Sequence, residues 1–344
     1  MARYYSSDGI TIHYGNCLEV MASMPADSVD AIITDGPYGL SFMGKGWDHA
    51  VPGVEYWSEM LRVAKPGAHL LSFGGTRLYH RMICAIEDSG WQIRDCIMWV
   101  YGSGFPKSHS LGKSVGEGWE AFGTALKPAW EPICLARKPL SEKTIAANAL
   151  VHGTGGLNID GCRIPVSEDD EIHAKNPHTQ GGFGHGDAVV YGTSVGAGAY
   201  NPRDGRWPAN LIHDGSEEVG GLFPVKKSTR HMSYKRGGGE FIDSIPSQPE
   251  KRWFVSEEGS ASRFFYCAKT SKKDRGAGNT HPTVKPRSLM RWLACLIGCQ
   301  PGSTILDPFM GSGSTLLAAR DEGLRSIGIE INEEYCEIAK NRIQ

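Results

Sequence analysis

Apolar residues in the first hundred positions fall into short runs that alternate between two spacings. Some runs are continuous and β-branched, such as VDAIIT, which is typical of a strand buried on both faces. Others repeat every three to four residues, which is typical of helices packed on one side. Strand then helix in this rhythm predicts a mostly parallel α/β sheet. Strands are predicted over 10–14, 29–34, 68–73 and 93–100, and helices over 17–24, 55–64 and 77–88.

The same rhythm returns near the C-terminus, after a long stretch without it. Residues 141–264 are rich in Gly, Asn and Ser with isolated aromatics, so we expect an irregular insert there. This pattern divides the chain into an ordered part over 1–140, the insert, and a second ordered part over 265–344. The final segments predicted are a helix over 288–298, strands over 303–307 and 326–331, and helices over 314–322 and 332–343.

Composition constrains the partners only weakly. The chain has 344 residues and a formal net charge of -2, which neither attracts nor repels nucleic acid overall. Residues 201–290, however, contain 16 Lys and Arg against 10 Asp and Glu. This local excess indicates either a polyanionic partner or an ordinary solvated face.

Cysteine usage and the N-terminal stretch predict the compartment. The nine cysteines form no C-x-x-C pair, and no His or Cys is spaced to complete a metal site with them. The first residues are polar, so neither a signal peptide nor a membrane span is expected. We therefore expect a cytoplasmic protein with reduced cysteines and no metal.

The first motif with chemical meaning is LDPFMGSGST, which begins at residue 306. A strand ends in Asp307, and Gly311 and Gly313 turn the chain into a helix whose free N–H groups favour an anionic group. Glu330 ends the next strand, where a carboxylate is placed to accept hydrogen bonds from ribose hydroxyls. The motif predicts a nucleoside-ligand site, although a Gly-x-Gly turn alone also serves simply to turn tightly.

The second motif is TDGPYG, which begins at residue 34. Asp35 follows a buried strand, so it lies at the edge of the sheet where ligands bind. A carboxylate, the backbone carbonyl of Gly36 and the flat ring of Tyr38 together suit the exocyclic amino group of a planar base. Asp, Gly and Pro are also common turn formers, so a plain strand-to-loop turn is the alternative.

Together, these motifs resemble those of the amino-group DNA methyltransferases. TDGPYG resembles their Asp-Pro-Pro-Tyr motif and DPFMGSGST their S-adenosylmethionine loop. Further likenesses are NTHPTVKP before that loop, GIEINEEYCEIAKNRI after it, and KPAWEPICLARKP as the last strand of the catalytic half. The catalytic motif comes first and the cofactor motif last, as in the circularly permuted β subgroup. The resemblance covers roughly 1–140 and 265–344, and implies that these are the catalytic half and the cofactor-binding half, with 141–264 as a target-recognition insert. It also implies a Rossmann-like methyltransferase fold with a seven-stranded, mostly parallel sheet.

The resemblance implies an activity and a set of residues. Methyl transfer from S-adenosylmethionine to the N6 of adenine in DNA is expected, because Asp rather than Ser precedes Pro-Tyr, with the N4 of cytosine as the alternative. The base would be extruded from the duplex and stacked on Tyr38. The implied catalytic residues are Asp35, Gly36, Pro37 and Tyr38. The implied cofactor-binding residues are Asn16, Cys17, Lys285, Asp307, Pro308, Phe309, Gly311, Ser312, Gly313, Ser314, Thr315 and Glu330.

Gly36 departs from the family motif, which has proline at this position. The carbonyl is retained, but the ring that fixes φ is lost, so a looser acceptor and reduced activity are expected. A catalytically weakened DNA-binding homologue is therefore one alternative. A dinucleotide dehydrogenase and an RNA or protein amino-methyltransferase are two others.

Double-stranded DNA is the expected partner, bound by a monomer or homodimer, in a setting such as restriction-modification. Loops after strands and the basic run KKSTRHMSYKR supply the candidate phosphate contacts. The candidate DNA-binding residues are Lys45, Lys107, Ser108, Lys226, Lys227 and Arg230.

Overall fold

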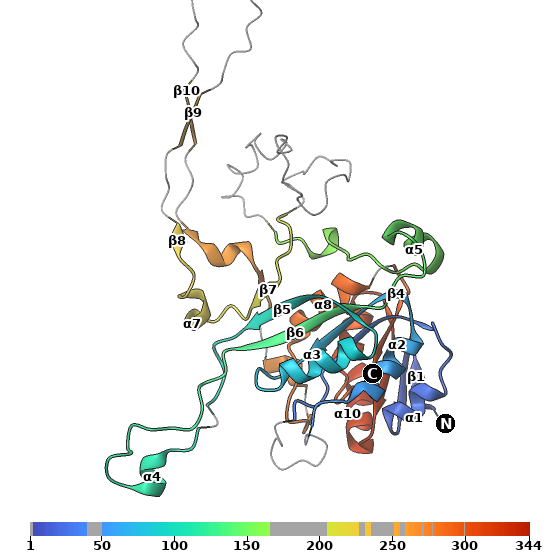
Figure 1. Ribbon diagram of the computed structural model, residues 1–344, viewed down its shortest axis with the longest axis horizontal. Coiled ribbons are helices and arrows are strands. Elements are labelled where there is room, and N and C mark those ends of the chain that lie inside the picture. The colour runs from blue at the N-terminus through green and yellow to red at the C-terminus, as the bar shows by residue number, and fades with distance from the viewer. Residues whose placement is uncertain are drawn as a thin grey trace, which may run out of the picture.

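A mixed β-sheet forms the centre of the molecule (Figure 1). The computed structural model describes residues 3–39, 50–106, 108–165, 205–226, 231–234, 251–254, 259–269, 272–276, 278–298 and 300–344. The strand order is β1-β2-β14-β13-β3-β4-β6-β5-β7-β12. These strands are β1 (Arg3–Ser7), β2 (Ile10–Tyr14), β3 (Val29–Thr34), β4 (Ala64–Phe73), β5 (Gln92–Val100), β6 (Trp130–Arg137), β7 (Leu211–His213), β12 (Tyr266–Cys267), β13 (Thr304–Asp307) and β14 (Arg325–Glu330).

The sheet has ten strands, so the expected count of seven was wrong. The six strands predicted from the apolar pattern are all present, as β2 to β5, β13 and β14, and β6 is the strand that the family resemblance implied. The three additional strands are β1, which pairs antiparallel with β2, and the short strands β7 and β12, which extend the sheet beyond β5. Strand β7 lies within residues 141–264, so part of the predicted insert continues the main sheet.

Two strands, β1 and β6, run opposite to the other eight strands of the sheet. From β2 to β4 all neighbours run parallel. Strand β6 is antiparallel to both β4 and β5, because β5 and β6 are joined as a long hairpin. The connection between them carries the short helix α4 (Leu111–Val115), which lies on an arm projecting from the body (Figure 1).

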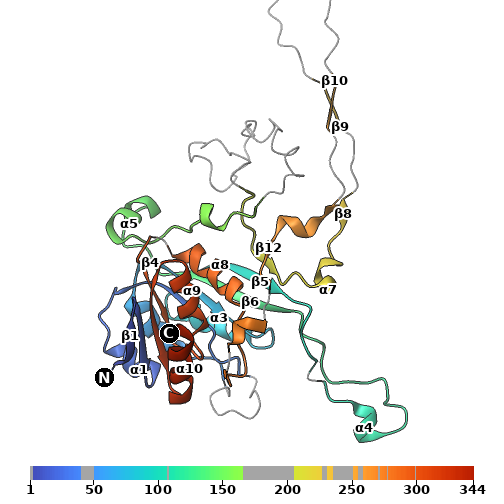
Figure 2. The ribbon, with the colours of Figure 1, turned by 180° about the vertical axis from the view of Figure 1, so that it is seen from behind.

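Helices cover both faces of the sheet, which makes three layers (Figures 1 and 2). Within β3, Ala31 and Ile33 belong to the apolar core beneath α8, whereas Ile32 belongs to the core beneath α2 and α3. This alternation is the two-residue period of a strand buried on both faces. The helices are α1 (Cys17–Ala22), α2 (Val54–Val63), α3 (Tyr79–Asp88), α5 (Ile145–His152), α7 (Glu217–Gly220), α8 (Arg287–Ile297), α9 (Ser314–Asp321) and α10 (Glu333–Ile343).

Small elements complete the described part of the chain. Two short antiparallel pairs, β8 with β11 and β9 with β10, lie outside the main sheet. Their bounds are β8 (Val225–Lys226), β9 (His231–Tyr234), β10 (Lys251–Phe254) and β11 (Gly259–Ser260). The 3₁₀ helices are η3 (Asp160–Cys162), η7 (Ala261–Phe264) and η8 (Lys272–Arg275). No helix in the described ranges is long and apolar enough to cross a membrane.

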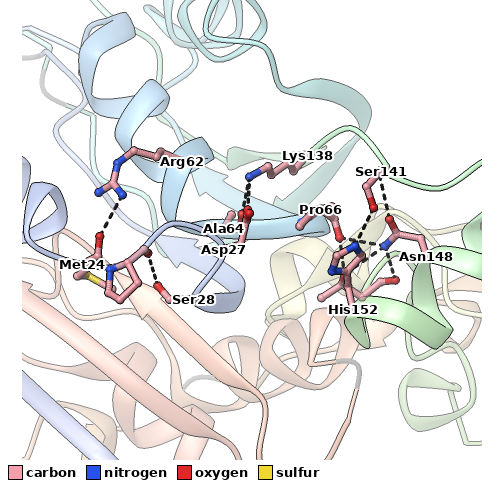
Figure 3. Close-up of polar contacts among 12 residues, drawn as sticks. Met24, Asp27, Ser28, Arg62, Ala64, Pro66, Lys138, Ser141, Asn148 and His152 are labelled. Carbon is pink, nitrogen blue, oxygen red and sulfur yellow. Dashed lines mark hydrogen bonds and ion pairs between the residues drawn. The ribbon is translucent and has the colours of Figure 1, made fainter.

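Polar contacts fix the loops at the edge where β3 and β4 begin (Figure 3). The ammonium group of Lys138, just after β6, donates to Asp27 Oδ1 and to the carbonyl of Ala64, both at 2.7 Å. The side chain of Asn148 on α5 donates to the carbonyl of Pro66 at 2.9 Å. These bonds satisfy backbone groups where the strands begin, and the opposite edge is where the candidate site lies.

Candidate functional site

The two sequence motifs meet at one edge of the sheet. Because β3, β13, β14 and β2 are parallel, their carboxyl ends lie together, and these ends carry Asp35, Asp307 and Glu330. All three residues line a single cavity of about 1620 Å³. That volume exceeds the ~300–1,000 Å³ of an ordinary small-molecule pocket, so there is room for two ligands.

Most residues predicted to bind the cofactor line this cavity. The exception is Gly313, which lies outside the lining. Its φ is +80°, and a Cβ there would approach that of Ala339 on α10 to 3.0 Å, so this glycine permits the turn and the close packing of α10. The predicted residues in the lining are Asn16, Cys17, Lys285, Asp307, Pro308, Phe309, Gly311, Ser312, Ser314, Thr315 and Glu330.

Glu330 anchors the glycine turn. Its carboxylate accepts the backbone N–H of Gly311 at 2.9 Å and that of Asn332 at 2.8 Å. Burial raises the pKa of Glu330, and these N–H bonds partly oppose the rise. Gly311 has a φ of +53°, and a Cβ there would come within 2.8 Å of the His281 ring. The turn therefore requires glycine both for its backbone and for its close neighbour.

Asp307 is a buried carboxyl beneath the turn. Its side chain accepts the Thr315 hydroxyl at 2.5 Å and the backbone N–H of Phe309 at 3.1 Å. Burial raises its pKa to about 7, aided by the negative charge of Asp35 and opposed by these two bonds. Asp307 thus ties the strand end to the first turn of α9.

Asp35 lies in a network of charged and phenolic groups. Its Oδ1 accepts the Tyr38 hydroxyl at 2.7 Å, and its Oδ2 pairs with the Lys285 ammonium at 3.0 Å. The same ammonium lies 3.0 Å from Glu131 Oε2, at the start of β6. The hydroxyl of Tyr101 donates to the other oxygen of Glu131 at 3.3 Å. The motif carboxylate is therefore held directly by Tyr38 and Lys285, and Glu131 and Tyr101 extend the network around it.

Lys285 was predicted to contact the cofactor, but its ammonium lies against the DGPY loop. Its ammonium contacts Asp35, Glu131 and the Tyr38 hydroxyl, and it lies over the Phe73 ring at 4.8 Å. Burial disfavours its charge, but the two carboxylates outweigh burial and raise its pKa. Lys285 is therefore a stable cation at the rim between the two motifs.

Gly36 is packed against the cofactor motif. A Cβ at this position would lie 3.1 Å from Cδ2 and 3.4 Å from Cε2 of Phe309, and 3.6 Å from Pro52. The Phe309 ring in turn contacts Tyr56, with ring centroids 5.8 Å apart. The Phe309 ring therefore lies where a side chain at position 36 would be, and this chain has glycine there instead of the proline of the family motif.

Comparison with known sequences identifies the family. The sequence profile of the N6/N4 methyltransferase family, described as DNA methylase, matches residues 29–341. The chain belongs to this N6/N4 DNA methylase family.

Relatives of this DNA methylase are named Type II methyltransferases. It is 21% identical to M.HindIII of Haemophilus influenzae over 385 residues, which covers 96% of this chain and 94% of that protein. It is 42% identical to M.ScaI of Streptomyces caespitosus over 118 residues, 34% of this chain and 35% of that protein. It is 45% identical to M.SmaI of Serratia marcescens over 64 residues. That last match spans 19% of this chain and 22% of M.SmaI, so the strongest likeness is confined to short segments.

A solved structure shares the fold of this DNA methylase. The match to the PvuII DNA methyltransferase, described as cytosine-N4-specific, has a TM-score of 0.52 and 14% identity. It covers 99% of this chain and 88% of that one. The chain therefore shares the fold of that DNA methyltransferase.

Few of the predicted DNA-binding residues have a described side chain in this DNA methylase. Lys45, Lys107, Lys227 and Arg230 lie outside the described residues, and Lys226 is described only by its backbone in β8. The Ser108 hydroxyl accepts the backbone N–H of Thr124 at 2.9 Å and of Ala125 at 3.3 Å. It holds the two sides of the arm together, and its contact with DNA stays a prediction.

Sequence reasoning missed Glu131 and Tyr101. Both lie at the ligand edge because β6 enters the sheet there, antiparallel to its neighbours, and β5 ends there. The signal in the sequence was the polar Glu131 at the start of an otherwise apolar strand, WEPICLA. An antiparallel strand presents its first residue, not its last, to this edge.

Proposed function

We propose that this protein is a DNA methyltransferase that transfers a methyl group from S-adenosylmethionine to the N6 of adenine. The observation that carries the proposal is the common cavity, in which Asp35 and the glycine turn at Gly311 face the same space. One ligand is held by each motif, as a two-substrate transfer requires. Adenine is preferred because Asp35 precedes the Pro-Tyr pair, which in the resembling subgroup accompanies N6 methylation.

The residues around the glycine turn fit a nucleoside cofactor. Glu330 retains acceptor capacity beyond its two backbone bonds and would accept ribose hydroxyls. The Phe309 ring and the buried Cys17 provide apolar surface beside it. Asn16 completes the proposed contacts at the rim, whereas the Lys285 ammonium is already paired with Asp35 and Glu131. When bound, S-adenosylmethionine supplies an electrophilic methyl group on a positively charged sulfur.

Asp35, Gly36 and Tyr38 would handle the target base. A base in a duplex must leave the stack for its amino group to reach Asp35. There the carboxylate and the Gly36 carbonyl would accept the two amino hydrogens, which favours the pyramidal nitrogen that attacks. The Tyr38 ring would stack on the base, a contact worth roughly 1–3 kcal/mol elsewhere. The carbon–nitrogen bond forms as the carbon–sulfur bond breaks, and one amino proton leaves, for which Asp35 is the nearest acceptor.

Three finer assignments belong to the same proposal. The motif order is that of the circularly permuted β subgroup, which the parallel pairing of β2 with β14 supports, because the two ends of the chain supply adjacent strands. The insert over 141–264 would read the DNA sequence. Lys45, Lys107, Ser108, Lys226, Lys227 and Arg230 would contact phosphates of double-stranded DNA.

The test is a transfer assay with a labelled methyl donor. Purified protein is incubated with unmodified DNA, and the DNA is digested to nucleosides. Label in N6-methyladenine is expected, and label in N4-methylcytosine would instead assign cytosine. Asp35→Asn should abolish incorporation while S-adenosylhomocysteine still binds, and Asp88→Asn on the exposed face of α3 is the matched control. Binding of S-adenosylhomocysteine without any transfer by the wild type would favour a catalytically weakened homologue.

A further inference from the structure

Four side chains from separate segments form a network with Asp35, in which Tyr38 and Lys285 contact it directly and Tyr101 is joined through Glu131. They are Tyr38 in its own loop, Tyr101 after β5, Glu131 at the start of β6 and Lys285 before α8. We propose that Lys285 and Glu131 form one unit that compensates the charge of Asp35 and keeps its carboxylate correctly aimed, with Glu131 acting as a positioning residue. This inference rests on the proposed function, since it gives a role in methyl transfer to residues outside the motif.

The hydrogen-bonding capacity of the Lys285 ammonium is fully used within this unit. An ammonium has three donors, and three acceptors lie in reach: Asp35 Oδ2 at 3.0 Å, Glu131 Oε2 at 3.0 Å and the Tyr38 hydroxyl oxygen at 3.1 Å. The side chain of Lys285 is only 10% exposed, so water competes little for these bonds. Its position is therefore fixed as long as both carboxylates are present.

The Tyr38 hydroxyl lies between the carboxylates of Asp35 and Glu131 and helps to position both. Its hydroxyl lies 2.7 Å from Asp35 Oδ1 and 3.1 Å from Glu131 Oε2, but it has one proton to donate. Burial raises the pKa of Tyr38 well above its usual range, and the two negative charges raise it further, so it remains a neutral donor. Lys285 and Tyr38 together leave one lone pair on each oxygen of Asp35 for the amino group of a base.

Other titratable groups facing Asp35 do not compensate its charge. Asp307, on β13, is acidic, and its own pKa rises partly because of Asp35. Burial lowers the pKa of His281, so its ring is neutral at neutral pH. In the described part of the chain, Lys285 is the cation that forms an ion pair with Asp35. Loss of Lys285 would leave Asp35 and Glu131 as like charges sharing one hydroxyl proton.

This arrangement predicts that a second substitution rescues the first. Lys285→Met leaves two uncompensated carboxylates, one of which takes up a proton, so Asp35 loses its acceptor role. Adding Glu131→Gln removes the repulsion, and Asp35 can ionise again. If the pair served only as a structural brace, the double variant would be at least as impaired as either single variant.

The decisive experiment compares single-turnover methylation rates of the wild type, Lys285→Met, Glu131→Gln and the double variant across about pH 6 to 9. We expect Lys285→Met to lose about 100-fold at neutral pH, with its acidic limb moved to higher pH. The double variant should regain roughly tenfold or more, with the limb restored. A double variant as slow as Lys285→Met, with an unmoved limb, would overturn the proposal. So would a loss of S-adenosylhomocysteine affinity as large as the loss of rate, because Lys285 would then act on the cofactor.

A stability measurement decides the same point without activity. In Lys285→Met the thermal midpoint should fall on going from about pH 5.5 to about pH 8, because the folded state then holds two neighbouring carboxylates. The double variant should not show this extra fall. Lys340→Met, which removes the partner of the half-exposed Glu337 on α10, is the matched control and should show no such pH dependence. An inactive wild type would refute the proposed function. The thermal midpoints of the wild type, Lys285→Met, the double variant and the control would still test the charge unit.

Discussion

Asp307 is a buried carboxyl whose protonation should be visible as a pH-dependent penalty on folding. It is 2% exposed, and burial raises its pKa from 3.8 to about 7. The folded protein therefore binds this proton more tightly than the unfolded chain does. Stability contributed by the protonated form is lost as pH rises through the window from 3.8 to about 7, and the penalty is constant above it.

The size of the penalty follows from the shift. A rise of about three pKa units corresponds to roughly 4 kcal/mol at alkaline pH, at about 1.4 kcal/mol per unit. Asp307→Asn removes it, because the amide is neutral at every pH. The amide oxygen can still accept the Phe309 N–H, and the Thr315 hydroxyl can reverse and accept from the amide nitrogen.

The assay is urea unfolding of the wild type and Asp307→Asn at about pH 5 and about pH 8. The stability of the variant relative to the wild type should increase by roughly 2–3 kcal/mol between these conditions, because about two of the three units lie in that window. Asp88→Asn, at an exposed position on α3, should show no such change. A difference between wild type and Asp307→Asn that is independent of pH would refute the reasoning that burial holds a proton on this group.

Three further predictions concern the ligand cavity. Glu330→Gln should weaken S-adenosylhomocysteine binding by about 10- to 100-fold in calorimetry, because charge-assisted bonds are lost, whereas Glu87→Gln on the exposed face of α3 should not. Gly311→Ala should destabilise the protein and also weaken S-adenosylhomocysteine binding, because the added Cβ would meet the His281 ring. Gly323→Ala, also at positive φ but in open space, should lower stability without changing this binding. Equal affinity of the two variants for S-adenosylhomocysteine would contradict the clash with His281. Gly36→Pro should slow methyl transfer, because the added ring would displace Phe309. The double variant Gly36→Pro, Phe309→Leu should transfer methyl groups faster than Gly36→Pro. A faster rate in Gly36→Pro than in the wild type would contradict the packing constraint.

The apolar pattern was sufficient to predict most strands that pass through the core, whereas β6 was predicted from the family resemblance alone. Strands such as β3 and β4 bury both faces, so their continuous runs are visible in the sequence. Strands β7 and β12 have three and two residues, too short to show any period. The expected sheet therefore contained the central strands and lacked the edge strands β1, β7 and β12.

Strand direction and side-chain convergence were not available from the pattern. An apolar run gives no sign of whether a strand is parallel, so the position of Glu131 at the ligand edge could not be deduced. Lys285 lies in the segment before the glycine turn, yet its ammonium reaches Asp35, more than two hundred residues earlier in the chain. Proximity to a motif in sequence was thus a poor guide to which ligand a side chain faces.

The pairing of β3 with β13 and of β2 with β14 has a consequence for synthesis. Both partners come much later in the chain than β2 and β3, so a nascent chain that ends before about residue 300 leaves an edge of each of these two strands unpaired. Such edges pair readily with other chains. Folding of the sheet must then wait until residues 304–330 have left the ribosome, and products terminated earlier should be captured by chaperones or aggregate rather than persist as partial enzymes.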